Sequence, residues 1–125
     1  MSDVDSEAEQ KEEGPRIGVY EGERNDLKER HGKGKNLYPN GDTYEGEYTH
    51  GVRGGPGLYR WKAGARYAGE YKESHRDGEG FFLYPDGSKY KGGFKAGKKH
   101  GLGTYLYANG DMYTGNWEDD LKSGE

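Results

Sequence analysis

The chain has 125 residues, which is enough for one domain or one short repeat array. Its formal net charge of −4 argues against a general nucleic-acid binder, and the absence of cysteine excludes disulfides and thiolate chemistry. An apolar fraction of 29% and a mean hydropathy of −1.33 would by themselves predict disorder. The 12 tyrosines, 3 phenylalanines and 2 tryptophans argue for a folded chain instead, because disordered segments are poor in aromatic residues.

Residues 1–16 are predicted to form an acidic, disordered tail. Six acidic residues between Asp3 and Glu13 outnumber Lys11 and Arg16. A docking arm for a basic partner is the alternative interpretation of this segment. The segment has neither the basic n-region nor the apolar h-region of a signal peptide, and no apolar run approaches the length of a membrane span.

From Tyr20 onward, one tyrosine recurs at intervals of 24, 23, 23 and 23 residues, and a glycine follows each of these tyrosines two places later. A fixed period of this length is typical of stacked copies of one supersecondary unit. We therefore predict a repeat array over residues 17–125, with an incomplete last repeat. The repeats begin near Tyr20, Tyr44, Tyr67, Tyr90 and Tyr113.

Each repeat reads Tyr-x-Gly-x-aromatic and then Gly-x-Gly-x-aromatic-x-aromatic. The local spacing of two predicts β-strands with rings and glycines on one face. Because a ring can lie over a strand glycine and cover its backbone, the glycines are expected to stabilise this face. The predicted aromatic face consists of Tyr44, Tyr48, Tyr59, Trp61, Tyr67, Tyr71, Phe82, Tyr84, Tyr90, Phe94, Tyr105, Tyr107, Tyr113 and Trp117.

Hairpin turns are predicted at Pro39–Asp42, Pro85–Ser88 and Ala108–Asp111, and more weakly at Lys62–Ala65, because glycine after Asn or Asp supplies a positive φ. The predicted fold is all-β: an elongated antiparallel meander in a single twisted sheet. Nine strands about 4.8 Å apart would extend roughly 40 Å. The fifth repeat is expected to stop before its second strand, which would leave residues 113–117 near an open edge.

The recurrence of Tyr44-Glu45-Gly46-Glu47-Tyr48 with Gly55 and Gly57, every 23 residues, resembles the MORN repeat (membrane occupation and recognition nexus). This resemblance covers residues 20–125 and implies a β-hairpin array with binding or scaffolding work. A phospholipid-tethering module and a targeting domain joined to an enzyme are the alternatives that the family leaves open.

Residues outside the repeat consensus resemble the members of this family that are structural subunits of the radial spoke head. That resemblance implies a place in the axoneme of motile cilia and flagella, within the cytoplasm and cytoskeleton. It implies other spoke-head subunits as partners. A second copy of the chain is a further candidate to cover the aromatic face, and membrane contact is disfavoured because nearby glutamates and the acidic tail offset the basic residues. The residues are Ile17–Asn25, Glu29–Gly32, Leu37–Gly46, Gly64–Tyr67 and Tyr84–Ser88.

No motif predicts catalysis or a cofactor. The Gly-x-Gly pairs neither continue to Gly-Lys-Ser/Thr nor open a helix, so they are not phosphate-binding loops. His31 and His100 occupy the same slot of different repeats, and we expect no closely paired histidines and no metal site. No convergent acid–base pair is evident, so we predict that the protein is not an enzyme.

One column of residues suggests a binding site. The slot two places before the first glycine of each Gly-x-Gly pair is basic, and a ladder of such residues along one loop edge could engage an acidic partner surface. The alternative is a solvated face with exposed ion pairs to Glu47, Glu70 or Glu73, each worth little. The basic column consists of Arg30, Arg53, Arg76, Lys99 and Lys122.

Overall fold

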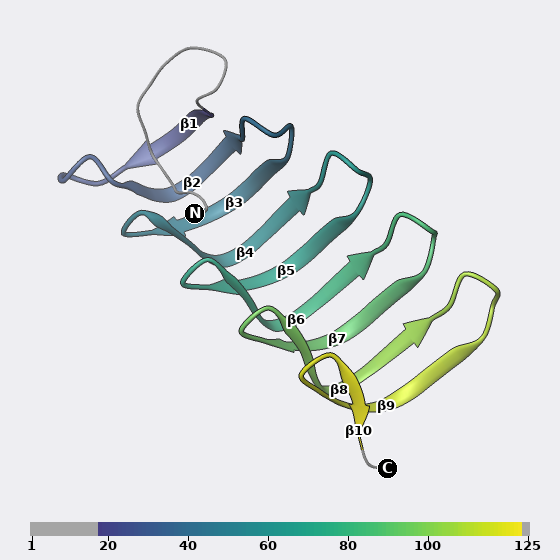
Figure 1. Cartoon of the computed structure of the whole chain (residues 1–125). Helices are drawn as coiled ribbons and strands as arrows, with labels where there is room; N and C mark the ends of the chain where they lie inside the picture. The colour runs from purple at the N-terminus through teal and green to yellow at the C-terminus, as the bar shows by residue number, and fades with distance from the viewer. Residues whose placement is uncertain (1–17, 124–125) are drawn as a thin grey trace.

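The computed structural model describes residues 18–123, and every regular secondary-structure element within this range is a β-strand. They form an elongated ribbon in which each strand lies beside the next (Figure 1). The strands are β1 (Val19–Arg24), β2 (Arg30–Leu37), β3 (Thr43–Thr49), β4 (Val52–Arg60), β5 (Arg66–Lys72), β6 (His75–Leu83), β7 (Lys89–Lys95), β8 (Lys98–Leu106), β9 (Met112–Glu118) and β10 (Leu121–Ser123).

The sheet has ten strands in sequence order, and every neighbouring pair is antiparallel. The predicted all-β meander is therefore confirmed. The expectation of nine strands is wrong, because β10 pairs with β9 and places Lys122 opposite Trp117. The fifth repeat thus begins its second strand within the described residues. The tail predicted for residues 1–16 lies outside them.

The turn inside each hairpin after the first has two residues, whereas Arg24 pairs with Arg30 across five residues in the first. Thr49 pairs with Val52 and Lys72 with His75, so the loops are His50-Gly51 and Glu73-Ser74. Both residues of each loop have positive φ: 47° and 89° in the first, 49° and 66° in the second. This is the type I′ pattern, which matches the twist of the strands. The Glu73-Ser74 turn adopts it without glycine, so its sequence alone did not predict it.

The turns between repeats are wider and follow the predicted sequences. The amide of Tyr38 donates to the Asp42 carbonyl at 2.9 Å, and the amide of Gly41 donates to the Tyr38 carbonyl at 3.0 Å. The Asn40 side chain also accepts a hydrogen bond from the Asp42 amide at 2.9 Å. This side-chain turn recurs at Asp86 and Asn109 but not at Ala63, which explains the weaker sequence pattern of that turn.

A row of paired glycines crosses nine strands. Each glycine lies directly opposite a glycine of the neighbouring strand, from β1 to β9. A Cβ at Gly69 would lie 2.5 Å from the Gly80 Cα, and a Cβ at Gly57 would lie 2.7 Å from Cζ of the Tyr44 ring. The row therefore has no room for side chains. It consists of Gly22, Gly34, Gly46, Gly57, Gly69, Gly80, Gly92, Gly103 and Gly115.

The register shifts just beyond the glycine row in each of the first four hairpins. Between Gly46 and Tyr48 the facing strand β4 carries additional residues, among them Gly55 with φ of 88°. The same shift occurs between Gly69 and Tyr71. Such β-bulges increase the local right-handed twist, so the recurring bulge accounts for the twist of the ribbon.

Substitution in the glycine row is expected to destabilise the sheet strongly. Gly69→Ala should lower the free energy of unfolding by about 1–3 kcal/mol or more, because the new Cβ meets backbone that cannot move aside. Gly54→Ala is the matched control, since its Cβ would meet the Thr49 hydroxyl oxygen at 3.2 Å and that side chain can rotate. Urea unfolding followed by circular dichroism measures both. Equal losses in the two variants would contradict the steric argument.

Candidate interaction surface

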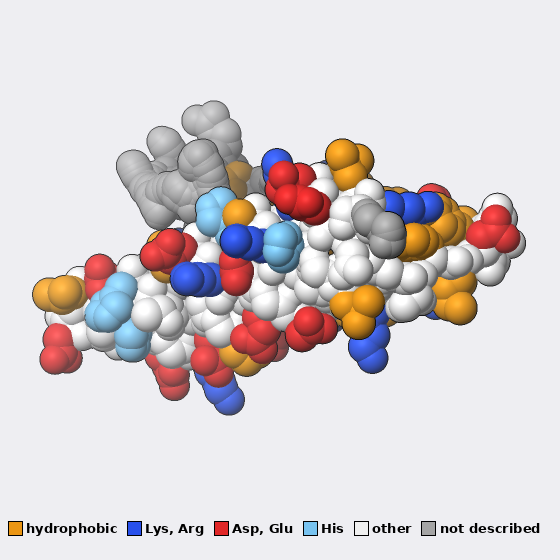
Figure 2. All heavy atoms as spheres, turned by 90° about the horizontal axis from the view of Figure 1, so that it is seen from below, with side chains coloured by type: hydrophobic (Ala, Val, Ile, Leu, Met, Phe, Trp, Pro, Cys, Tyr) orange, Lys and Arg blue, Asp and Glu red, His pale blue; other side chains and the backbone are white. Residues whose placement is uncertain are grey.

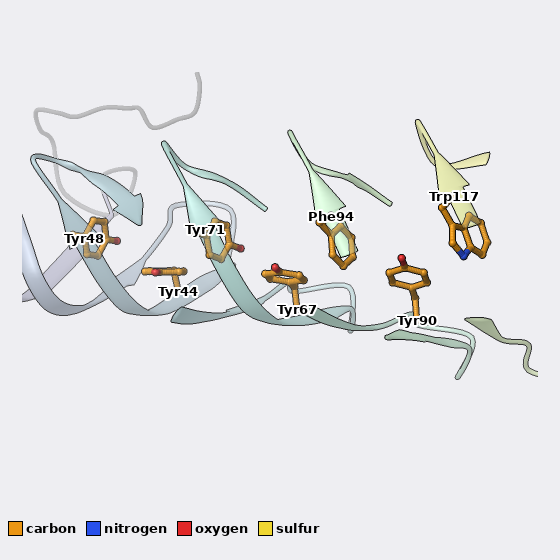
Figure 3. Packing of buried hydrophobic residues seen from close by; sticks show 7 residues of the cluster. All are labelled: Tyr44, Tyr48, Tyr67, Tyr71, Tyr90, Phe94 and Trp117. Carbon is orange, nitrogen blue, oxygen red and sulfur yellow. The ribbon is translucent and has the colours of Figure 1, made fainter. Parts of the chain in front are cut away.

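Nine aromatic rings form a continuous zigzag along one face of the sheet, which we call the inner row. Successive rings meet edge to face, with centroids 5.1–5.5 Å apart and interplanar angles of 81–89°. Figure 3 shows the alternating orientation of seven of them. Each such contact contributes about 0.5–1.5 kcal/mol beyond burial. In spatial order, the inner row is Tyr20, Tyr48, Tyr44, Tyr71, Tyr67, Phe94, Tyr90, Trp117 and Tyr113.

The repeat tyrosine is the most buried ring in each of the three middle repeats. Tyr44, Tyr67 and Tyr90 are fully buried, with an exposed fraction of 0%. Each ring runs along its own strand, and its hydroxyl donates to the backbone carbonyl three residues later, at 2.7–2.9 Å. The polar tip of the ring is thus satisfied without leaving the sheet.

A second line of rings, the outer row, lies beside the inner row and is half-buried. Its centroid distances run from 4.4 to 5.7 Å. Buried polar residues of the inter-repeat turns anchor it. The Tyr59 hydroxyl donates to the Asp42 carboxylate at 2.8 Å, and the hydroxyls of Ser88 and Tyr105 form a hydrogen bond of 3.1 Å. The outer row is Tyr38, Tyr59, Trp61, Phe82, Tyr84, Tyr105 and Tyr107.

Thirteen of the fourteen aromatic residues predicted for the face lie in or against the buried cluster, and the remaining one, Tyr107, contacts Tyr105. The prediction omitted Tyr20 and Tyr38, which also pack against the cluster. The sequence contained the information for both. Tyr20 marks a repeat, and Tyr38 precedes Pro39 as Tyr84 precedes Pro85.

The basic column lies over the aromatic face near the two-residue turns. The Arg53 guanidinium carbon is 5.6, 5.4 and 5.2 Å from the ring centroids of Tyr44, Tyr59 and Tyr71. Arg76 and Lys99 each have four rings within 5.9 Å of the charged group. Arg30 and Lys122 each lie over two rings. The column therefore makes cation–π contacts with both rows.

Hydrogen bonds tie the middle of the column to the next hairpin. Arg53 donates to the Tyr38 hydroxyl at 2.7 Å and to the Ser74 carbonyl at 2.9 Å. Arg76 donates to the Gly97 carbonyl at 2.6 Å. The backbone carbonyls of Arg53 and Arg76 in turn accept from the amides of Ser74 and Gly97, both at 2.9 Å. The column thus holds adjacent repeats together.

The charge of two column members is not neutralised locally. Among residues 18–123, no carboxylate lies within 4.0 Å of the Arg53 or Arg76 guanidinium, so neither forms the ion pair considered for Glu47, Glu70 or Glu73. Their Nε atoms are buried and also have no hydrogen-bond partner there. Lys99 does have a carboxylate partner, since its Nζ lies 3.4 Å from Asp120. Within the described residues, the face therefore retains positive charge at Arg53 and Arg76.

Two histidines meet although they are distant in sequence. The rings of His31 and His50 are 5.0 Å apart, and His31 Nδ1 accepts the His50 amide at 3.1 Å. The expectation of no closely paired histidines is wrong, because stacking brings adjacent hairpins together. Hydrogen bonds from Asn25, and then from His50, hold the pKa of Glu29 below its ordinary value. No group of three or more potential ligands in the described range could hold a metal ion.

The fold and its face define a β-hairpin repeat protein whose core is one layer of rings over glycine. The MORN repeat family model matches residues 28–43, 44–66, 67–89, 90–112 and 113–125, which together are most of the chain. The chain therefore belongs to the MORN-repeat family. No helix in the described part of the chain is long and apolar enough to cross a membrane.

Two curated relatives carry the same name. The chain is 58% identical to the mouse Radial spoke head 1 homolog over 48 residues, which are 38% of this chain and 16% of that protein. It is 50% identical to the carp Radial spoke head 1 homolog over 50 residues, 40% of this chain and 22% of that protein. The matched stretches thus span less than a quarter of either relative.

The buried tyrosines predict unfolding in alkali. Burial raises the pKa of Tyr71 and Tyr90 to about 12, and raises those of Tyr44, Tyr48 and Tyr67 further. These pKa values exceed the value of about 10 for tyrosine in an unfolded chain. The buried tyrosines therefore contribute their full stabilisation of the fold below about pH 10, and this contribution is lost as the pH rises toward 12.

This titration can be followed by tyrosinate absorbance at 295 nm together with near-ultraviolet circular dichroism. The two signals should change together above pH 10 in the folded chain. In urea, the absorbance should instead rise near pH 10, which is the control. Ionisation of most tyrosines near pH 10 with an unchanged dichroism spectrum would contradict the burial argument.

Proposed function

We propose that the chain is a non-catalytic scaffold subunit, or part of one, of the radial spoke head in motile cilia and flagella. The observation that carries this proposal is the identity of 58% and 50% to two radial spoke head proteins. Membership of the MORN-repeat family supports it. The location that follows is the axoneme, and the partners that follow are other spoke-head subunits.

The proposed mechanism is mechanical. The edge-to-face ring ladder runs from the first described hairpin to the last, and backbone hydrogen bonds of 2.8–3.2 Å link each basic-column residue from Arg30 to Lys99 to the next two-residue turn. A ribbon held at every repeat resists bending. Partner contacts made in parallel along it would share the load between repeats.

A phospholipid tether is the alternative function. It requires the column charges to reach an anionic lipid surface, where each contributes about 1 kcal/mol. Only 14% of the Lys99 side chain is exposed. The guanidinium groups of Arg53 and Arg76 lie over aromatic rings and are hydrogen-bonded to backbone carbonyls. This geometry favours a protein surface that fits over the rings. Charged side chains of both signs are also interspersed over the molecular surface seen in Figure 2.

The location can be tested directly. A tagged chain expressed in multiciliated cells should give an axonemal signal and should co-purify with radial spoke head subunits. A plasma-membrane pattern without axonemal signal would contradict the proposal and favour the lipid tether.

The basic column should be required for that incorporation. Combined Arg53→Met, Arg76→Met and Lys99→Met substitutions remove the charges but retain apolar contact with the rings, so the sheet should remain folded while incorporation falls at least tenfold. Charge reversal is unsuitable here, because it would place carboxylates against the negative faces of the rings.

The matched control is Lys35→Met, Lys89→Met and Lys91→Met, three exposed lysines on the opposite face. These substitutions should leave incorporation unchanged. Thermal unfolding of both triple variants verifies the fold. Normal incorporation of the column variant would show that its charges have only a structural role.

A further inference from the structure

The outer row and the basic column form one strip along the array, with two rings and one cation in each of the three middle repeats. The rings are half-buried and therefore present partial surface to solvent. Trp117 donates its indole N–H to the Gly103 carbonyl at 3.2 Å, whereas the indole N–H of Trp61 makes no hydrogen bond with residues 18–123. The strip thus offers aromatic surface, free donor capacity and positive charge together.

The spacing of the strip selects the conformation of a ligand. Each repeat has two strands, and adjacent strands lie about 4.7–4.9 Å apart, so the pattern recurs every 9.4–9.8 Å approximately. A polyproline II helix advances about 3.1 Å per residue with three residues per turn, or about 9.3 Å per turn. A β-strand repeats its face about every 6.6–6.8 Å, and two turns of α-helix span about 10.8 Å. Only polyproline II keeps step with the repeats.

The chemistry of the strip agrees with this spacing. Proline rings pack on aromatic side chains, and the backbone carbonyls of polyproline II are free to accept hydrogen bonds from donors such as the Trp61 indole. The guanidinium groups of Arg53 and Arg76 lack a carboxylate partner within the described range. An acidic side chain once per turn of the ligand would lie near one column cation in each repeat.

We propose that this strip binds a partner-protein segment in polyproline II conformation, with prolines and one acidic residue in every three. The segment crosses the strands and matches one residue triplet to each repeat. A second copy of the chain is a poorer occupant, because packing two aromatic faces together would place the basic column of one copy against that of the other, and the like charges would repel. The inference deepens the proposed scaffold function by naming the class of partner segment.

The test uses the full chain and synthetic peptides, with affinity measured by fluorescence anisotropy. Acetylated (Pro-Pro-Glu)5 should bind at least tenfold more tightly than (Pro-Pro-Gln)5 and than (Pro-Pro-Pro-Glu)4, whose charges are four residues apart. (Pro-Pro-Lys)5 should not bind. Added salt should weaken the (Pro-Pro-Glu)5 complex, because its contacts are partly ionic.

Two variants locate the site. Trp61→Ala should weaken binding of (Pro-Pro-Glu)5 at least tenfold, whereas Phe81→Ala, at an exposed ring on the opposite face, should not change it. If Trp61→Ala disrupts the fold, the double variant Arg53→Met and Arg76→Met decides instead. It should bind (Pro-Pro-Glu)5 no more tightly than (Pro-Pro-Gln)5.

Three results would overturn the inference: no binding of (Pro-Pro-Glu)5 at millimolar concentration, equal affinity for the three-residue and four-residue spacings, or self-association of the chain that Trp61→Ala abolishes. The last result would identify a second copy as the occupant. Peptide binding without spoke-head incorporation would refute only the ciliary function, and incorporation without peptide binding would refute only this inference.

Discussion

The contact between a tyrosine ring and the glycine row is the interaction on which the structure depends. Because the paired glycines leave the backbone bare, the rings of Tyr44, Tyr67 and Tyr90 can lie along their own strands and become fully buried in a single-layer sheet. Their hydroxyls then reach a carbonyl three residues on, and their edges and faces meet the next ring. A side chain in the glycine row would remove all three contacts together.

This arrangement explains the structural role of the basic column, to which we propose that a binding role is added. A one-layer core needs something to cover its rings, and a guanidinium can do so by cation–π contact while keeping its charge. Arg53 and Arg76 also donate to the turn of the next hairpin, so each joins two repeats. Among residues 18–123, the lack of a carboxylate partner for Arg53 and Arg76 is consistent with this structural use.

The functional consequence that we propose is recognition of a partner through the regular spacing of the repeats. The described repeats present nearly the same group of rings and cation again and again, and no enclosed catalytic constellation is needed for such a surface to bind. The proposed spoke-head role and the proposed polyproline II ligand both use this regularity. Differences between repeats, such as the contact of His31 with His50, could distinguish one end of the ribbon from the other.

The sequence alone determined the strands, the antiparallel order and the aromatic face, because alternation with a period of two assigns faces and Asn-Gly or Asp-Gly turns reverse the chain. It also indicated that rings would cover glycine. Only the tertiary structure decided what meets across repeats: Arg53 beside Ser74, His31 beside His50, and the short strand β10 opposite β9. Those contacts join residues as many as 21 positions apart, and their geometry depends on register and bulges, which local periodicity does not specify.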